Sequence, residues 1–275
     1  MLVDIVIPVV NKNDGIHHCL HSLQKLRPII KSVIIINQTG KKIKSANILN
    51  VLEVKTNKIS ASEARNKGAK YSCAEYLMFI DDDAFILNAG IKNLKTFLKT
   101  NIYDVLLLKR ADKYSKAREK LSIRNFPNYV IEWNLIIRRS LFEEFKGFPS
   151  FGVGSKSRAQ SGESFLLIGR MISSKKAQIK IVRDTEVSHP TLSLVLTEAK
   201  AKGYLYGNGH AIGLLSRELK FIDKLYWLFR VHLAFIKRTI FASKYLLLLN
   251  FRAFLMPLQT LVGFWYALFI IEDKS

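Results

Sequence analysis

Short apolar runs alternate with helix-like stretches through the first 100 residues of the chain. Continuous aliphatic runs of this kind are typical of strands buried on both faces of a parallel sheet, and they occupy residues 4–10, 32–36, 48–54 and 75–80. Between them, apolar residues recur at helical spacing in 17–25, 60–69 and 91–98. The alternation predicts an α/β fold with a doubly wound, mostly parallel sheet and flanking helices.

Beyond residue 104 the pattern becomes mixed. It predicts a strand over 130–137, a short helix over 139–145, a glycine-rich loop over 147–162, a helix from Gly162 to about residue 175, and a strand over 179–182. The glycine-rich stretch Gly203–Gly209 lacks the preceding strand of a phosphate loop. We interpret it as a flexible segment, either a cover over a bound ligand or an ordinary linker. The chain therefore divides into an α/β domain over 1–200 and a helical region over 201–275.

The helical region alternates basic and bulky apolar residues over 216–252. An amphipathic helix of that composition suits the surface of an anionic bilayer. Residues 253–271 carry no charge and approach spanning length, although Pro257, Gln259, Thr260 and Gly263 weaken that interpretation. We expect interfacial or re-entrant helices rather than a full span. A helical core or a dimer interface is the alternative.

The charge of the chain is strongly positive. Lys and Arg number 43 against 22 Asp and Glu, a formal net charge of +21. A field of this sign favours phosphates, anionic lipids or nucleic acid as surroundings. The excess is spread evenly along the chain and no recognised nucleic-acid-binding module is present, which argues against nucleic acid.

The strongest local signal is the acidic triplet of Asp81, Asp82 and Asp83, directly after a predicted strand. Three adjacent carboxylates repel one another, and a bound cation removes that repulsion. Hard oxygen ligands at this density suit Mg²⁺ or Mn²⁺ bridging a diphosphate. A solvated acidic turn is the alternative, but the position after a buried strand favours the metal.

Five segments, in order, resemble those of family 2 glycosyltransferases with the GT-A fold, of the bacterial surface-polysaccharide type. They are IVIPVVN (5–11), SEARNKGA (62–69), FIDDDA (79–84), EWNLIIRRSLFEEFKGF (132–148) and GESFLLIGR (162–170). The resemblance covers roughly residues 1–190. It implies a nucleotide-sugar donor and a divalent cation, Mg²⁺ or Mn²⁺.

The resemblance also implies the donor side of the site. Asn37 stands where relatives often have an aspartate that recognises the base, and Arg65 would support the diphosphate or the carboxylates. Asp81 and Asp83 match the DxD pair, in which Asp83 would bind the metal and Asp81 would face the ribose. The full set of implied donor-binding residues is Pro8, Val9, Asn11, Asn37, Arg65, Asp81 and Asp82.

On the acceptor side, Ser164 stands where many relatives have the aspartate that acts as general base. Glu163 is then the one carboxylate of the local motif, and we assign the base to it; an acid favoured only by the helix dipole is the alternative. Trp133 would line the acceptor site, with a buried core tryptophan as the alternative, and Arg170 would contact a phosphate or pair with Glu163. His189 would complete the metal or diphosphate site, unless it is purely structural.

The resemblance as a whole predicts an inverting glycosyltransferase. It would move a sugar to a glycan or a polyprenyl-linked acceptor at the cytoplasmic face of a bacterial inner membrane. The alternatives are a nucleotidyltransferase of the same fold, a non-catalytic relative, and a basic protein that binds membranes or nucleic acid.

Overall fold

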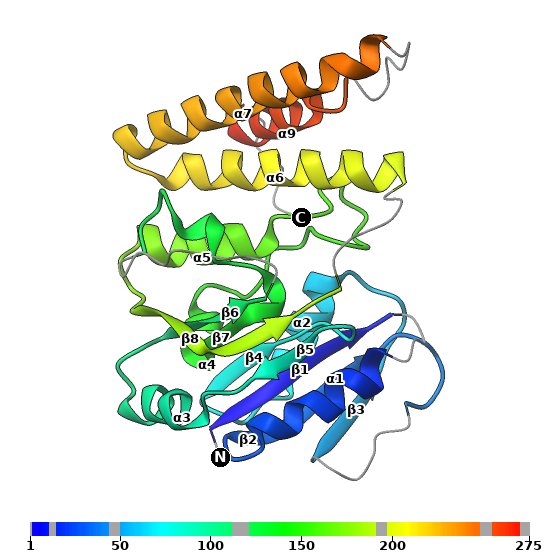
Figure 1. The fold of residues 1–275 in the computed structure, drawn as a ribbon, viewed down its shortest axis with the longest axis vertical. Coiled ribbons are helices and arrows are strands. Elements are labelled where there is room, and N and C mark those ends of the chain that lie inside the picture. Colours follow the sequence, from blue (N-terminus) through cyan, green and yellow to red (C-terminus); the bar gives the residue numbers. More distant parts are fainter. Residues whose placement is uncertain are drawn as a thin grey trace.

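The computed structural model describes residues 2–10, 15–43, 50–111, 121–190, 197–247 and 255–269, without the side chains of 241–247. The chain forms a central sheet with helices on both faces, and three further helices stack beyond one of these faces (Figure 1).

In the described residues, eight strands form one sheet in the order β3-β2-β1-β4-β7-β6-β8-β5. Their bounds are β1 Val3–Val9, β2 Ile30–Asn37, β3 Val51–Lys55, β4 Tyr76–Phe79, β5 Phe85–Asn88, β6 Val105–Arg110, β7 Leu135–Arg138 and β8 Ile179–Ser188. The first four strands are parallel, as the sequence predicts.

The second half of the sheet is mixed. β7 runs antiparallel to β4 and β6, β5 runs antiparallel to β8, and β6 and β8 are parallel. The prediction of a mostly parallel sheet is therefore correct for one half only. The short link between β4 and β5 leaves no room for the crossover that a parallel neighbour requires, and β5 joins the far edge instead.

The helices that flank the sheet are α1 Gly15–Leu23, α2 Ala61–Lys70, α3 Ile91–Thr100, α4 Arg139–Glu144 and α5 Glu163–Ser173. Short 3₁₀ turns cover Gln24–Leu26, Phe126–Asn128 and Glu132–Asn134. The turn over Glu132–Asn134 lies inside the strand predicted over 130–137, so that β7 begins only at Leu135. There the buried Asn134 accepts from the Ile131 amide and donates to the carbonyls of Leu108 and Tyr129.

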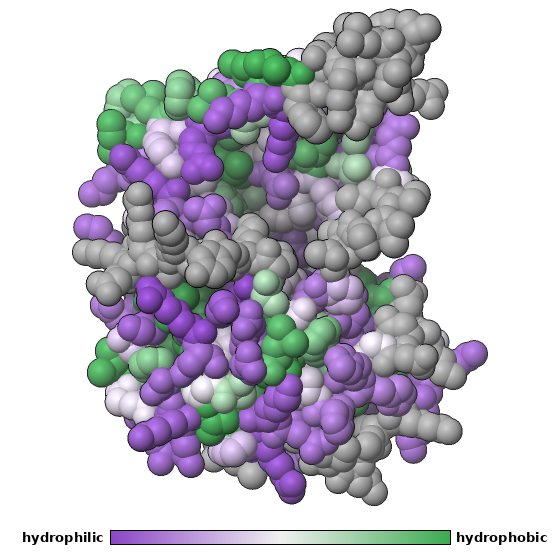
Figure 2. Space-filling view, viewed as in Figure 1, coloured by the Kyte–Doolittle hydropathy of each residue, from purple (hydrophilic) through white to green (hydrophobic). Residues whose placement is uncertain are grey.

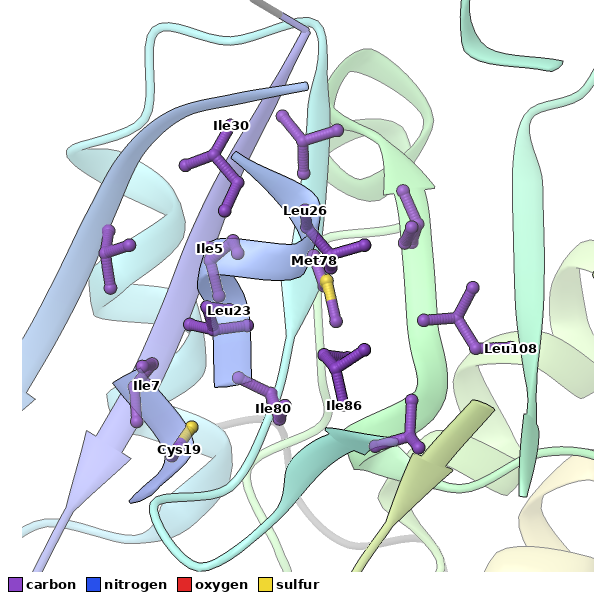
Figure 3. Close-up of a cluster of buried hydrophobic side chains, with 14 of the residues drawn as sticks. Ile5, Ile7, Cys19, Leu23, Leu26, Ile30, Met78, Ile80, Ile86 and Leu108 are labelled. Carbon is purple, nitrogen blue, oxygen red and sulfur yellow. The ribbon is translucent and has the colours of Figure 1, made fainter. Parts of the chain in front are cut away.

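Alternate residues of the central strands enter cores on the two faces of the sheet. Ile5 and Ile7 of β1 pack with Leu23 of α1 on one face (Figure 3), whereas Val6 packs on the other face with residues of α5. Burial on both faces accounts for the continuous apolar runs in the sequence.

In the described part of the chain, three helices form the outer layers: α6 Glu198–Glu218, α7 Phe221–Leu247 and α9 Leu258–Phe269. The interpretation of Gly203–Gly209 as a flexible segment is wrong, because these residues lie inside α6. A Cβ atom at Gly209 would lie 1.9 Å from the Thr260 carbonyl oxygen, and one at Gly263 would lie 2.1 Å from that of Tyr206. The glycines serve close packing of α6 against α9.

None of the described helices combines the length and the hydrophobicity that a membrane-spanning helix requires. The domain boundary predicted at residue 200 falls inside the first turn of α6.

Candidate active site

The candidate site lies at the carboxyl edge of the parallel half of the sheet. β1 and β4 are parallel neighbours, with Val6 beside Phe79, so their carboxyl ends meet at this edge. Asp81, Asp82 and Asp83 follow β4 directly. Open α/β sheets bind ligands outside this edge. Pro8 and Val9 end β1 there, whereas Asn11 lies outside the described residues.

Arg65 of α2 connects two sides of the site. The helix begins at a capping box of Ser60 and Glu63, as predicted. From its second turn, the Arg65 guanidinium Nη2 donates to Asp81 Oδ1 at 2.5 Å, while Nη1 lies 3.6 Å from Glu163 Oε1. The Arg65 side chain is 4% exposed. One buried cation therefore holds a carboxylate from the end of β4 and another from the start of α5.

Glu163 is the first residue of α5 and is 2% exposed. Its carboxylate packs directly on Gly152, where a Cβ atom would lie 2.7 Å from Glu163 Oε1 and the φ of +121° also favours glycine. Burial, followed by the charge of Glu132, raises the pKa of Glu163 to about 8. Glu163 Oε2 and Arg65 Nε and Nη1 are buried without a hydrogen-bond partner in the described part of the chain.

A second carboxylate, Glu132, lies beside Glu163, and our sequence analysis did not identify it. The Ser164 hydroxyl donates to Glu132 Oε1 at 2.7 Å. Glu132 is partly exposed, in contrast to Glu163. Ser164 stands where the resemblance implies an aspartate, and its hydroxyl instead binds the carboxylate of Glu132, which lies 32 residues earlier in the chain. No local sequence signal links the two residues, because their contact depends on how β7 enters the sheet.

The aspartate triplet forms a compact acidic cluster with His189. The imidazole Nε2 lies 3.0 Å from Asp83 Oδ1 and 3.8 Å from Asp81 Oδ2. Burial, then Asp83 and Asp81, raises the pKa of Asp82 to about 7. The hydrogen bond from His189 lowers the pKa of Asp83. Although burial opposes it, the same bond raises the pKa of His189 to about 9.

Trp133 positions His189 in this structure. The two rings are stacked at 5.3 Å with an interplanar angle of 15°, and the Arg110 guanidinium lies 5.1 Å from the Trp133 ring centroid. The indole is 5% exposed. Within the described ranges, no three His, Cys, Asp or Glu side chains are arranged to hold a metal ion.

The sequence from residue 4 to 159 matches the family model described as glycosyl transferase family 2. The chain belongs to this family. The match covers more than half of its length, so the resemblance drawn from the five segments is confirmed.

Two curated relatives act on poly(ribitol-phosphate) according to their names. One is the poly(ribitol-phosphate) beta-N-acetylglucosaminyltransferase TarP of Staphylococcus aureus, with 27% identity over 115 residues; the match covers 38% of this chain and 35% of that protein. The other is a poly(ribitol-phosphate) beta-glucosyltransferase of Bacillus spizizenii, with 31% identity over 121 residues; the match covers 39% of this chain and 19% of that protein. The matches thus span about a third or less of each relative.

Solved structures share the fold. S. aureus TarS 1–349 in complex with UDP-GlcNAc superposes with a TM-score of 0.59 at 19% identity, covering 79% of this chain and 66% of that one. The mannosyltransferase PcManGT of Pyrobaculum calidifontis, in complex with GDP-Man and Mn²⁺, gives 0.60 at 13% identity and covers 99% and 88%. These similarities establish a GT-A architecture for this family 2 chain.

Two residues implied by the family 2 resemblance have structural partners. Asn37 is 1% exposed, donates to Glu53 Oε1 at 2.6 Å and accepts from the Thr39 amide at 2.8 Å. It therefore shapes the turn after β2. Arg170 pairs with Glu218 of α6 through contacts of 2.6 to 3.1 Å and ties α5 to α6.

Proposed function

We propose that this family 2 chain transfers a sugar from a nucleoside-diphosphate sugar to an acceptor hydroxyl with inversion at the anomeric carbon. One observation carries the proposal: a single buried guanidinium, that of Arg65, joins Asp81 on the donor side to Glu163 on the acceptor side. A direct displacement needs both sides, because negative charge develops on the departing diphosphate while a proton leaves the attacking hydroxyl.

The acidic cluster suits a divalent cation. The mutual repulsion that contributes to the raised pKa of Asp82 is the unfavourable interaction that a bound cation removes. Carboxylate oxygens suit both Mn²⁺ and Mg²⁺, and an imidazole nitrogen beside them suits Mn²⁺ better than the harder Mg²⁺. We assign metal binding to Asp83 and His189. When bound, the cation would stabilise charge on the leaving diphosphate. PcManGT, which shares the fold, was solved in complex with Mn²⁺, and this supports a divalent cation but does not identify its ligands.

The base belongs to the pair of Glu163 and Glu132. As the acceptor oxygen bonds to the anomeric carbon, the bond from that carbon to the diphosphate breaks and the hydroxyl proton passes to a carboxylate. Glu163, assigned from the sequence, is almost fully buried behind Gly152. Glu132 is the partly exposed member and is held by Ser164. We therefore assign contact with the acceptor to Glu132, with Glu163 supporting it from behind.

The proposed acceptor is a phosphate-bearing polyol or glycan, as the names of the curated relatives suggest. A cavity of about 360 Å³ between the 150–158 loop, α6 and α9 supports it. Phe151, Tyr206 and His210 form its apolar walls, and Arg158 stacks 4.4 Å from the Tyr206 ring centroid. Aromatic faces suit sugar rings and the guanidinium suits phosphate. Phe151, which lines the cavity, is followed by Gly152, on which the Glu163 carboxylate packs.

Calorimetric titration with a panel of nucleoside diphosphates, with and without Mn²⁺, tests the donor site. We expect one nucleotide to bind in a Mn²⁺-dependent manner, and Asp83→Ala to abolish binding. Asp184→Ala is the matched control, because Asp184 is an exposed carboxylate of β8 that accepts from Asn93. If no nucleotide binds, the transferase proposal fails. Donor binding without transfer to any hydroxyl acceptor would instead favour the non-catalytic relative.

A further inference from the structure

Helix α7 carries apolar residues on two opposite faces. Its inner face is buried in the protein: Trp227 and Val231 are 3% and 2% exposed, and the Trp227 ring packs edge-on against Phe126 and Phe165. Its outer face nevertheless also carries large apolar side chains, exposed by 41 to 75%. These residues, which we call the outer stripe, are Phe221, Ile222, Leu225, Phe229, Ile236 and Ile240.

The outer stripe follows one side of the helix in two groups, from Phe221 to Phe229 and from Ile236 to Ile240. At about 100° per residue, its six members fall within an arc of about 100°, and the centre of this arc lies roughly opposite Trp227 and Val231. Figure 2 shows hydrophobic side chains gathered along the upper edge of the molecule over α7, with hydrophilic ones beside them. Single exposed apolar residues are ordinary, but several gathered along one side of a helix mark an interaction surface.

Basic residues flank the outer stripe. Arg230 and Lys237 are exposed and Lys224 is partly exposed. The single acidic residue of α7, Asp223, lies 3.0 Å from Arg124 and is neutralised by it. The stripe therefore has a positively charged border in which no free acidic side chain of α7 takes part.

We propose that the outer stripe docks α7, lying flat, on an anionic lipid bilayer. Apolar side chains would enter the boundary between head groups and acyl chains, and the flanking cations would meet the lipid phosphates. A second copy of this chain fits less well, because a symmetric contact would bring the same basic border against itself on a molecule of net charge +21.

The arrangement of layers agrees with such docking. α7 packs on α6 and α9, and these helices lie between it and the sheet (Figure 1). Docking through the outer stripe would therefore leave the carboxyl edge of the sheet accessible to a donor from solution. The proposal does not depend on the transferase assignment, since it rests on α7 alone.

Vesicle co-sedimentation tests this surface with the full chain. We expect binding to vesicles of phosphatidylglycerol and phosphatidylcholine and much weaker binding to phosphatidylcholine alone. Phe229→Glu combined with Ile236→Glu should reduce binding at least about ten-fold. Lys237→Gln should reduce it about five-fold. Ile102→Glu is the matched control: Ile102 is 60% exposed, close to the 65% of Phe229, but follows α3.

Several outcomes would overturn the proposal. They are equal binding to neutral and anionic vesicles, no vesicle binding at all, or full binding by the doubly substituted chain. A dimer detected by light scattering that the double substitution dissociates would assign the stripe to a second copy instead. Unchanged nucleotide binding and thermal unfolding of the variants establish that the fold and the donor site are intact.

Discussion

Replacing Glu132 by Gln separates the proposed chemistry from the fold. The substitution keeps the shape of the side chain, and the Ser164 hydroxyl can still donate to the remaining amide oxygen at the position where it now meets Glu132 Oε1 at 2.7 Å. What is lost is the ability to accept a proton. A positioned general base contributes about 10²–10⁴-fold to the rate, so kcat should fall by that factor, equivalent to about 3–5 kcal/mol of barrier.

The assay compares kcat with donor affinity. Transfer from the sugar donor of the nucleotide that binds in the panel to a synthetic oligo(ribitol phosphate), the acceptor class proposed above, gives kcat. Calorimetry with the nucleoside diphosphate gives the dissociation constant. We expect kcat to fall by the factor given above and the dissociation constant of the nucleoside diphosphate to stay within about two-fold of its original value. Glu75→Gln is the matched control, since Glu75 pairs with Arg138 at the opposite end of β4 and should leave both quantities unchanged.

A second substitution makes the test sharper. Ser164→Asp, introduced into the Glu132→Gln chain, restores a carboxylate at the same point of the site, and kcat should recover at least about ten-fold. Two results would refute the reasoning: a Glu132→Gln enzyme with near-normal kcat, or one that loses donor affinity together with rate. The first would return the base to Glu163, and the second would make Glu132 a residue of the donor site.

Three further predictions concern stability. Arg65→Met should lower the free energy of unfolding by up to about 3–5 kcal/mol at pH 7, because it removes the buried cation that the partly exposed Asp81 and the buried Glu163 share. Arg170→Met, in an exposed pair, should cost about 1 kcal/mol or less in urea unfolding. Since the pKa of Glu163 is raised from 4.5 to about 8, the folded state binds the extra proton, and its stability falls as pH rises through this window. In the Glu163→Gln chain, the free energy of unfolding should fall less steeply between pH 5 and 8.5. Gly209→Val should separate α9 from α6 and expose the C-terminal region to proteolysis, whereas Gly203→Ala should be milder, because its nearest neighbour is a flexible side chain.

The features that the sequence predicts correctly are local ones. Continuous apolar runs identify β1 to β4, the pair of Ser60 and Glu63 identifies the start of α2, and the aspartate triplet follows a strand at the carboxyl edge as expected. Each of these signals depends on burial or capping within a few residues. They are sufficient to place Arg65 and the acidic cluster at one edge of the sheet.

The features that escaped prediction depend on long-range packing. The glycines of α6 resemble a linker in the sequence, yet Gly209 is required by a carbonyl on α9, which lies far away along the chain. Glu132 is identifiable only once the antiparallel β7 has brought the turn before it next to α5. Periodicity carries no information about such contacts, because they are made between elements rather than within them.

Two buried carboxylates show how the fold separates structural from functional acids. Asp4, 1% exposed, accepts from the hydroxyls of Ser32 and Ser72 and from the amides of Cys73 and Ala74. Although burial opposes it, these bonds lower its pKa.

Glu163 is as deeply buried, but one of its oxygens has no hydrogen-bond partner in the described structure, and burial with a neighbouring carboxylate raises its pKa. A buried polar atom left without a partner costs about 1–3 kcal/mol. A fold that satisfies Asp4 completely could satisfy Glu163 by the same means. The acid that remains incompletely bonded, Glu163, lies beside Arg65 and Glu132. Of the two buried carboxylates in the described residues, the incompletely bonded one therefore lies at the proposed site, and perturbed acids tend to gather at such sites.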